Sequence, residues 1–183
     1  TVPANRPITI ADLLTHTAGL SYGIVSQHPV DEMYRSGDLI GARSEGTLER
    51  VVDAIAGLPL RHQPGIRWSY SMATDVLGRV IEVVDGQPFA DALRRRILEP
   101  LGMVDTGFSV PDENLHRFAA CYQPAPGTLA PVLFDPPVTS TFREPAWSSG
   151  GGGLVSSMAD YHRFCQMLLA GGALDGQRIL GPR

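Results

Sequence analysis

Apolar residues recur at intervals of three and four along several stretches of the chain, which is the spacing of one helix face. The stretches cover residues 10–18, 48–56, 72–85, 88–99 and 158–170. In residues 72–85 the repeat is carried by Val76, Leu77, Val80, Ile81 and Val84. The pattern therefore predicts a chain built mainly from helices of moderate length.

Polar and glycine residues mark the ends of these helices. Thr9-x-x-Asp12 and Ser157-x-x-Asp160 have the spacing of capping boxes, in which two side chains satisfy each other's free backbone donors. Ser71 is suited to the N-cap of the helix that follows it, and Thr47 to the N-cap of residues 48–56. Gly19 is a plausible left-handed stop for the first helix, and Gly86 is expected to end the helix over residues 72–85.

Two regions lack helical periodicity. Residues 21–46 contain several glycines and read as a long irregular connection. Residues 105–147 are proline-rich and extended, with the best strand at 118–122 and a hairpin turn at Pro126-Gly127. We find no internal repeat and no second-domain boundary. The sequence predicts an α+β fold, mostly helical, in which residues 1–183 form a single partial domain with one small β hairpin.

Composition and charge exclude some functions. The 183 residues are 43% hydrophobic and 19% charged, with a net charge of -4 and a pI near 5.7, which does not suit nucleic-acid binding. The basic run Arg94-Arg95-Arg96 is expected to be a solvated helix face. No apolar run reaches the ~18 residues of a membrane span. Cys121 and Cys165 cannot form a disulfide framework, and Cys165 is expected to be a buried thiol.

Four segments occur in an order that identifies a family. They are the run from Thr9 to Leu20, Trp68-Ser69-Tyr70-Ser71, residues 97–108 with Leu101-Gly102-Met103, and Gly150 to Ser157 followed by Asp160. This series resembles the serine β-lactamase and penicillin-binding-protein superfamily, in particular class C β-lactamase-like proteins and carboxylesterases of the same fold. The resemblance covers nearly the whole chain. It implies that the chain is the helical region of that fold with part of the cleft wall, and that the main sheet lies outside these residues.

The resemblance carries one catalytic residue onto this chain. The family's Tyr-x-Asn motif maps onto Tyr70-Ser71-Met72, so Tyr70 is expected to be the catalytic phenol. A free phenol has a pKa near 10, and a lysine ammonium held against it would lower that pKa and allow proton transfer at neutral pH. The family's Ser-x-x-Lys and Lys-Thr-Gly-type motifs have no counterpart here, because all fifteen basic residues are arginine.

The third motif position departs from the family pattern. In members that recognise β-lactams an asparagine there offers its amide to the substrate, whereas this chain has Met72, whose thioether cannot donate a hydrogen bond. This difference favours an esterase over an antibiotic hydrolase.

Other candidate residues have simpler interpretations. Gly19-Leu20-Ser21-Tyr22-Gly23 matches the nucleophile elbow G-x-S-x-G, but a helix rather than a strand precedes it. Asp75 and His162 are the partners that such a triad could use. His16 is expected to be a buried histidine that ties a turn together. The four glycines from Gly150 are expected to allow close backbone packing. The remaining histidines lack the spacing of a zinc site, and we expect no cofactor or metal.

The resulting hypothesis is a piece of a serine hydrolase that, in a longer protein, cleaves a small ester, amide or β-lactam through an acyl-enzyme. By itself this chain is expected to be inactive. The alternatives are a non-catalytic relative that serves as a binding or scaffold domain, and an α/β-hydrolase that uses Ser21. The chain begins at Thr1, without methionine, and we expect both ends to be cut. No signal peptide is visible within these residues, and the sequence assigns neither compartment nor oligomeric state.

Overall fold

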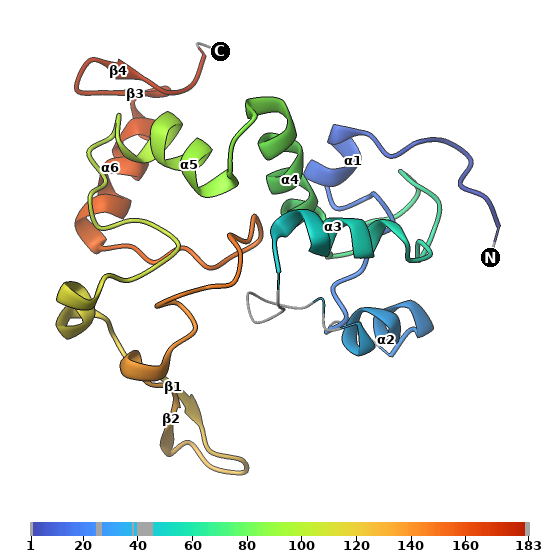
Figure 1. Ribbon diagram of the computed structural model, residues 1–183, viewed down its shortest axis with the longest axis horizontal. Coiled ribbons are helices and arrows are strands. Elements are labelled where there is room, and N and C mark those ends of the chain that lie inside the picture. The colour runs from blue at the N-terminus through green and yellow to red at the C-terminus, as the bar shows by residue number, and fades with distance from the viewer. Residues whose placement is uncertain (1, 25–26, 38, 40–45, 182–183) are drawn as a thin grey trace. The chain divides into compact units, whose positions relative to one another are not determined.

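The computed structural model describes residues 2–24, 27–37, 39 and 46–181. The chain divides into two compact units, one made of Thr1–Leu93 with Ala146–Gly153 and the other of Arg94–Pro145 with Leu154–Arg183. Figure 1 shows the order of their helices and strands along the chain. The expected fold class is confirmed: the described residues are mostly helical and carry two small two-stranded sheets. That residues 1–183 form one partial domain stays a prediction.

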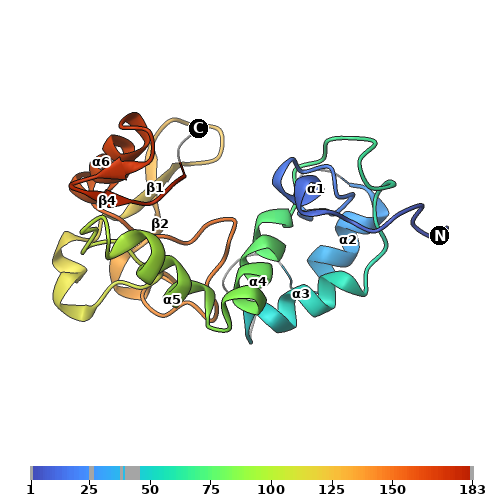
Figure 2. The same ribbon diagram turned by 90° about the horizontal axis from the view of Figure 1, so that it is seen from above.

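The first unit is helical. Its elements are α1 (Ile10–Leu14), α2 (Pro29–Ser36), α3 (Leu48–Ala56), α4 (Ala73–Asp85) and α5 (Phe89–Leu93). Helices α3 and α4 lie side by side, and α1 contacts α4 (Figure 2). Their apolar faces meet in one buried cluster, formed by Leu13, Ala18, Leu20, Val30, Tyr34, Leu39, Leu48, Val51, Ile55, Met72, Ala73 and Trp147.

Most predicted helix ends of this unit are confirmed. Thr9 and Asp12 form the complete capping box, and Thr47 caps α3 through the amide of Arg50. Gly86 ends α4 in the left-handed conformation, with φ 67°. The stop expected at Gly19 is wrong, because α1 ends at Leu14. Gly19 has φ 84° and lies in a bend at residues 18–19, beyond the end of the helix.

The irregular connection expected over residues 21–46 contains a helix. Pro29 occupies the first turn of α2, where its missing N–H costs nothing, and His28 caps the helix through the amide of Val30. Val30 and Tyr34, four residues apart, are buried in the core of the first unit. This prediction was wrong because two buried apolar residues are too few to produce a visible periodicity. Residues 25–26, 38 and 40–45 of that connection lie outside the described residues.

The N-cap of α4 is Met72 rather than Ser71, and Met72 makes no side-chain cap bond. Ser71 is buried, and its hydroxyl lies 3.2 Å from Nδ1 of His16. The expectation for Ser71 was wrong because its hydroxyl has a partner from elsewhere in the chain.

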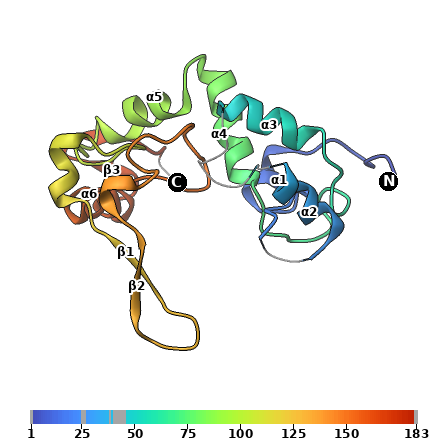
Figure 3. The same cartoon turned by 60° about the horizontal axis from the view of Figure 1, so that its bottom comes forward.

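The longest helix of the second unit is α6 (Met158–Leu169). It also contains a π-helix (Arg94–Leu98), 3₁₀ helices at Asp112–Arg117 and Pro137–Thr139, and the hairpins β1 (Cys121–Pro124) with β2 (Pro131–Asp135) and β3 (Ala173–Leu174) with β4 (Gln177–Arg178). Strands β1 and β2 extend away from the helices of this unit (Figure 3). The hairpin predicted around Pro126-Gly127 is present, with its first strand three residues later than expected. The helix predicted for residues 88–99 changes to π-helix at Arg94, and Arg94, Arg95 and Arg96 are exposed as expected.

The predicted buried face of α6 is largely exposed. Ser157 caps the helix through the amide of Asp160, as expected. The Asp160 carboxylate, however, accepts hydrogen bonds from the amide of Asp105 (2.7 Å) and the hydroxyl of Thr106 (2.8 Å). Cys165 is exposed, so the expectation of a buried thiol was wrong. Helix α6 instead buries the side that carries Asp160 and Met167. Among the described residues, no helix is long and apolar enough to span a bilayer.

Candidate active site

Tyr70 lies in a segment without regular secondary structure, residues 68–71, just before α4. Its side chain is 40% exposed, so it remains open to solvent rather than sealed in the core. The next two residues are buried, with Met72 part of the apolar cluster of the first unit. Within this motif the tyrosine therefore faces outward, and the methionine that replaces the family's asparagine faces the core.

The Tyr70 ring lies among other aromatic rings. Tyr22 stacks on it with centroids 5.3 Å apart and planes 12° apart. The His16 ring lies 5.1 Å from Tyr70 at 45°, and 6.3 Å from the Trp68 ring at 68°. Stacked and tilted aromatic pairs at these distances are favourable beyond their burial, so they restrict the direction of the Tyr70 side chain.

His16 ties the turn before Tyr70 together. Its backbone has φ 54°, which is uncommon for a residue with a Cβ. The His16 carbonyl accepts a hydrogen bond from the amide of Ser69 (2.9 Å), and its Nδ1 lies 3.2 Å from the hydroxyl of Ser71. The structural role expected for His16 is thus present, although the residue is half-buried rather than buried.

Ser21 does not form a nucleophile elbow. Its side chain is fully buried, and its hydroxyl donates a hydrogen bond to the carboxylate of Asp31. Helix α1, not a strand, precedes it. The two residues named as triad partners for this alternative are engaged differently. Asp75 accepts a hydrogen bond from Ser149, and His162 is exposed on α6. The geometry of an elbow requires an exposed hydroxyl on a strand-to-helix turn, which Ser21 does not have.

The glycine run packs closely, as expected, and its contacts are with the first turn of α4. A Cβ at Gly150 would overlap the carbonyl of Thr74, and one at Gly151 would lie 2.9 Å from the Thr74 hydroxyl. The Asp75 carboxylate accepts hydrogen bonds from Ser149 Oγ (2.5 Å) and the Gly151 amide (3.2 Å). The run therefore lies directly on the turn that follows Tyr70.

Burial shapes the electrostatics next to Tyr70. Burial raises the pKa of Asp75, and its hydrogen bonds from Ser149 and Gly151 oppose that rise. Among the described residues, Oδ2 of Asp75 is buried without a hydrogen-bond partner. Burial also raises the pKa of Tyr22, and the charges of Asp75 and Tyr70 add to the effect. Tyr22 therefore stays a neutral phenol at neutral pH, and its ring can stack on Tyr70 without adding charge.

Sequence reasoning missed the polar groups that contact Ser69, the residue before Tyr70. Asp31 is completely buried and lies 3.6 Å from Nη1 of Arg61, whose side chain is 15% exposed. Arg61 also donates to Ser69 Oγ at 3.2 Å. Thirty residues separate Asp31 from Arg61, so no local spacing could have revealed the pair. The glycines on both sides of Ser21 and Tyr22 were the one available signal.

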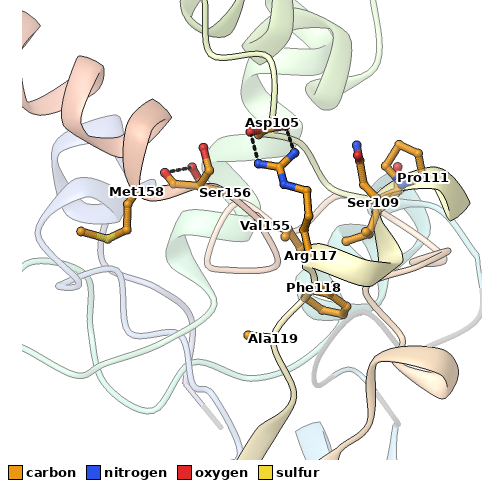
Figure 4. Close-up of a pocket in the computed structure, with 12 residues that line it drawn as sticks. Asp105, Ser109, Pro111, Arg117, Phe118, Ala119, Val155, Ser156 and Met158 are labelled. Carbon is orange, nitrogen blue, oxygen red and sulfur yellow. Dashed lines mark hydrogen bonds and ion pairs between the residues drawn. The ribbon is translucent and has the colours of Figure 1, made fainter.

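Two further surfaces of the units are hollowed. In the first unit an apolar groove of about 480 Å³ lies between α1, α3 and α4 and is lined by residues such as Ile10, Val52 and Val80. In the second unit a cavity of about 400 Å³ has Phe118 and Met158 on its wall, beside the two hydrogen bonds of Arg117 to Asp105 (2.8 and 2.6 Å; Figure 4). Among the described residues, no three His, Cys, Asp or Glu side chains are placed to hold a metal ion.

Comparison with known proteins gives the family. The family described as Beta-lactamase matches residues 1–183. Protein Rv1367c of Mycobacterium tuberculosis is 40% identical over 100% of this chain and 44% of its own length, and esterase EstB of Burkholderia gladioli is 36% identical over 89% and 45%. The solved structure of EstCE1, a hydrolase with promiscuous acyltransferase activity, superposes with a TM-score of 0.77 at 28% identity, covering 96% of this chain and 49% of that one.

The chain thus spans less than half the length of these relatives. Three observations agree: the family match along all 183 residues, the mostly helical α+β fold, and the similarity to a solved hydrolase. The chain belongs to the β-lactamase family, on its class C and esterase-like side.

Proposed function

We propose that this chain is part of a serine hydrolase that cleaves esters through an acyl-enzyme, with Tyr70 as its acid/base group. The observation that carries the proposal is the position of Tyr70: an outward-facing phenol, flanked by Tyr22 and His16, at the motif position where the family has its catalytic tyrosine. The serine nucleophile and the lysine belong to parts of the longer protein outside these residues, since the chain contains no lysine.

The reaction consists of two acyl transfers. A serine oxygen attacks the ester carbonyl, and the bond to the leaving alcohol breaks as the serine proton passes to that alcohol. Water then attacks the acyl-serine, gives its proton back to the serine oxygen, and releases the acid. Tyr70 would relay both protons, which is typically worth about 10²–10⁴ in rate. A cation beside the phenol would favour its ionised form and make it a competent base.

An ester substrate is favoured over a β-lactam by the position of Met72. Its side chain is 1% exposed and packs in the core, so this motif position offers a substrate no polar group. The family members named above as an esterase and as a hydrolase with acyltransferase activity support the same class of substrate. Amide substrates remain a second outcome of the test.

The test uses the full-length protein. We expect it to hydrolyse p-nitrophenyl butyrate at least about 100-fold more efficiently than nitrocefin, since one lost hydrogen-bonding group is worth several kcal/mol. A fluorescent phosphonate should label it stoichiometrically, and Ser21→Ala should keep that labelling. Equal efficiency on nitrocefin would refute the ester preference. Stoichiometric labelling of the 183-residue chain by itself would refute a nucleophile outside it.

A further inference from the structure

The segment that carries Tyr70 is fixed on both sides of that residue. The Ser69 amide donates to the carbonyl of His16 at 2.9 Å, and the Met72 amide donates to the carbonyl of Ser21 at 3.0 Å. Tyr70 lies between these two attachment points, and its ring faces outward. Any movement of either point changes the direction of the phenol.

Four side chains, of which Ser21 and Asp31 are buried, join the two attachment points. Ser21 Oγ donates to the Asp31 carboxylate, and both residues are completely buried. Arg61 Nη1 lies 3.6 Å from Asp31 Oδ1 and donates to Ser69 Oγ at 3.2 Å. Ser21, Asp31, Arg61 and Ser69 thus form a continuous polar chain that links the attachment at Met72 to the one at Ser69. We call these four residues the polar clamp.

A glycine brings Arg61 to this place. Gly19 has φ 84°, and its carbonyl accepts a hydrogen bond from the Arg61 amide at 2.8 Å. A Cβ at Gly19 would overlap the carbonyl of His62. The G-x-S-x-G motif therefore has a structural explanation: the first glycine admits the 61–62 backbone, Ser21 holds Asp31, and Tyr22 stacks on Tyr70.

A gain in stability does not explain why the Asp31–Arg61 ion pair is present. Taking a carboxylate and a guanidinium out of water costs several kcal/mol, and their attraction roughly offsets that cost. Apolar residues of similar volume often replace such a pair without loss of stability. What apolar residues cannot do is direct a hydrogen bond to Ser69, one residue before Tyr70.

We propose that the polar clamp is a positioning device for the Tyr70 phenol, and that Asp31 and Arg61 are positioning residues of the acyl-transfer reaction. This inference rests on the proposed function of Tyr70. Displacement of a reacting group by about 1 Å can cost about 10² in rate. Disrupting the clamp should therefore lower kcat without changing how the substrate is first bound.

The test is a double-mutant cycle in the full-length protein. Ser69→Ala removes the link to Tyr70 and leaves the Asp31–Arg61 pair intact, while Asp31→Asn with Arg61→Met removes both charges together. Each is made in the wild-type and in the Tyr70→Phe background, with Ser36→Ala on α2 as the surface control. Turnover of p-nitrophenyl butyrate is divided by the active sites that the phosphonate titrates, so that unfolded protein does not count.

In the wild-type background, Ser69→Ala should lower kcat about three- to tenfold and the double substitution about 10- to 100-fold, with KM within about twofold. In the Tyr70→Phe background the same substitutions should change kcat by less than about twofold. Equal losses in both backgrounds, or no loss in either, would overturn the clamp. If Tyr70→Phe itself leaves kcat unchanged, the proposed function fails instead.

Discussion

The rings of Tyr22 and Tyr70 stack with their centroids 5.3 Å apart and their planes 12° apart. Tyr22 is half-buried, whereas Tyr70 faces outward. The inner ring thus serves as a platform for the outer one. The platform comes from the segment between α1 and α2, and the phenol from the segment before α4, so the stack joins two parts of the first unit.

Removing the platform should impair catalysis more than removing its hydroxyl. An aromatic pair of this kind is worth about 0.5–1.5 kcal/mol, which restricts where the Tyr70 ring points. In the full-length protein, Tyr22→Phe should keep kcat within about twofold, and Tyr22→Ala should lower it about tenfold. Steady-state kinetics on p-nitrophenyl butyrate measure both. A larger loss for Tyr22→Phe than for Tyr22→Ala would show that the hydroxyl, not the stack, matters.

The glycine run offers a matched pair of substitutions. A Cβ at Gly150 would overlap the Thr74 carbonyl, whereas one at Gly152 meets nothing within 4 Å. Gly150→Ala should therefore reduce the free energy of unfolding by about 1–3 kcal/mol, the usual cost of overpacking. Gly152→Ala should change it by less than about 1 kcal/mol. Urea denaturation followed by circular dichroism measures the difference, and equal effects would contradict the close contact with α4.

The Asp12 carboxylate should make the stability of the folded protein depend on pH. Hydrogen bonds from Arg6 (2.7 and 2.8 Å) and from the Thr9 amide (2.8 Å) hold the pKa of the Asp12 carboxyl well below its ordinary value. A lowered folded-state pKa adds stability above the unfolded-state pKa of about 3.9, and this gain disappears as the pH falls through the folded-state value.

Asp12→Asn should therefore be less stable than the wild type at about pH 7, and the difference should shrink as the pH falls below about 4. Asp53→Asn, on the exposed side of α3, is the control. Thermal melts from about pH 7 down to about pH 2 test this. A difference between Asp12→Asn and wild type that is constant across the whole range would exclude the carboxylate as its cause.

The contribution of Asp75 to stability should change with pH in the opposite direction to that of Asp12. Burial raises the pKa of its carboxyl, so the folded state takes up a proton more readily than the unfolded state. The sign follows: this residue's contribution to stability increases as the pH falls. Asp75→Asn keeps an acceptor for Ser149 and Gly151 and removes the charge, so at about pH 7 it should match or exceed the wild type in melting temperature.

Its advantage over the wild type should shrink toward low pH, whereas Asp75→Ala should be destabilised throughout because both hydrogen bonds to Oδ1 are lost. Melting temperatures of the three proteins from about pH 4 to 8 decide the matter. An Asp75→Asn protein that is as unstable as Asp75→Ala at neutral pH would contradict a cost from the buried charge.

The sequence predicted those features that depend on neighbouring residues. The capping box of Thr9 and Asp12, the cap at Thr47, the stop at Gly86 and the hairpin turn at Pro126-Gly127 are all present. Each is decided within a few residues by side-chain bonds or by the freedom of glycine. The close packing of the glycine run was also predictable, since few other roles suit such a segment.

Features that depend on distant residues were not predictable. Ser71 bonds His16, fifty-five positions earlier, instead of capping α4. Cys165 lies on an exposed face although it follows the apolar spacing of α6, because spacing alone does not say which face is covered. The Asp31–Arg61 pair could not be found for the same reason: its partners meet only after the chain has folded.

The most direct test of the account is the turnover number of Tyr70→Phe in the full-length protein, with Tyr122→Phe as its control. Tyr122 lies on β1 with 60% of its side chain exposed. We expect Tyr70→Phe to lower kcat for p-nitrophenyl butyrate about 10²–10⁴-fold with its melting temperature unchanged, and Tyr122→Phe to stay within about twofold of the wild type. A folded Tyr70→Phe protein that keeps the wild-type kcat would contradict the assignment of Tyr70 as the acid/base group.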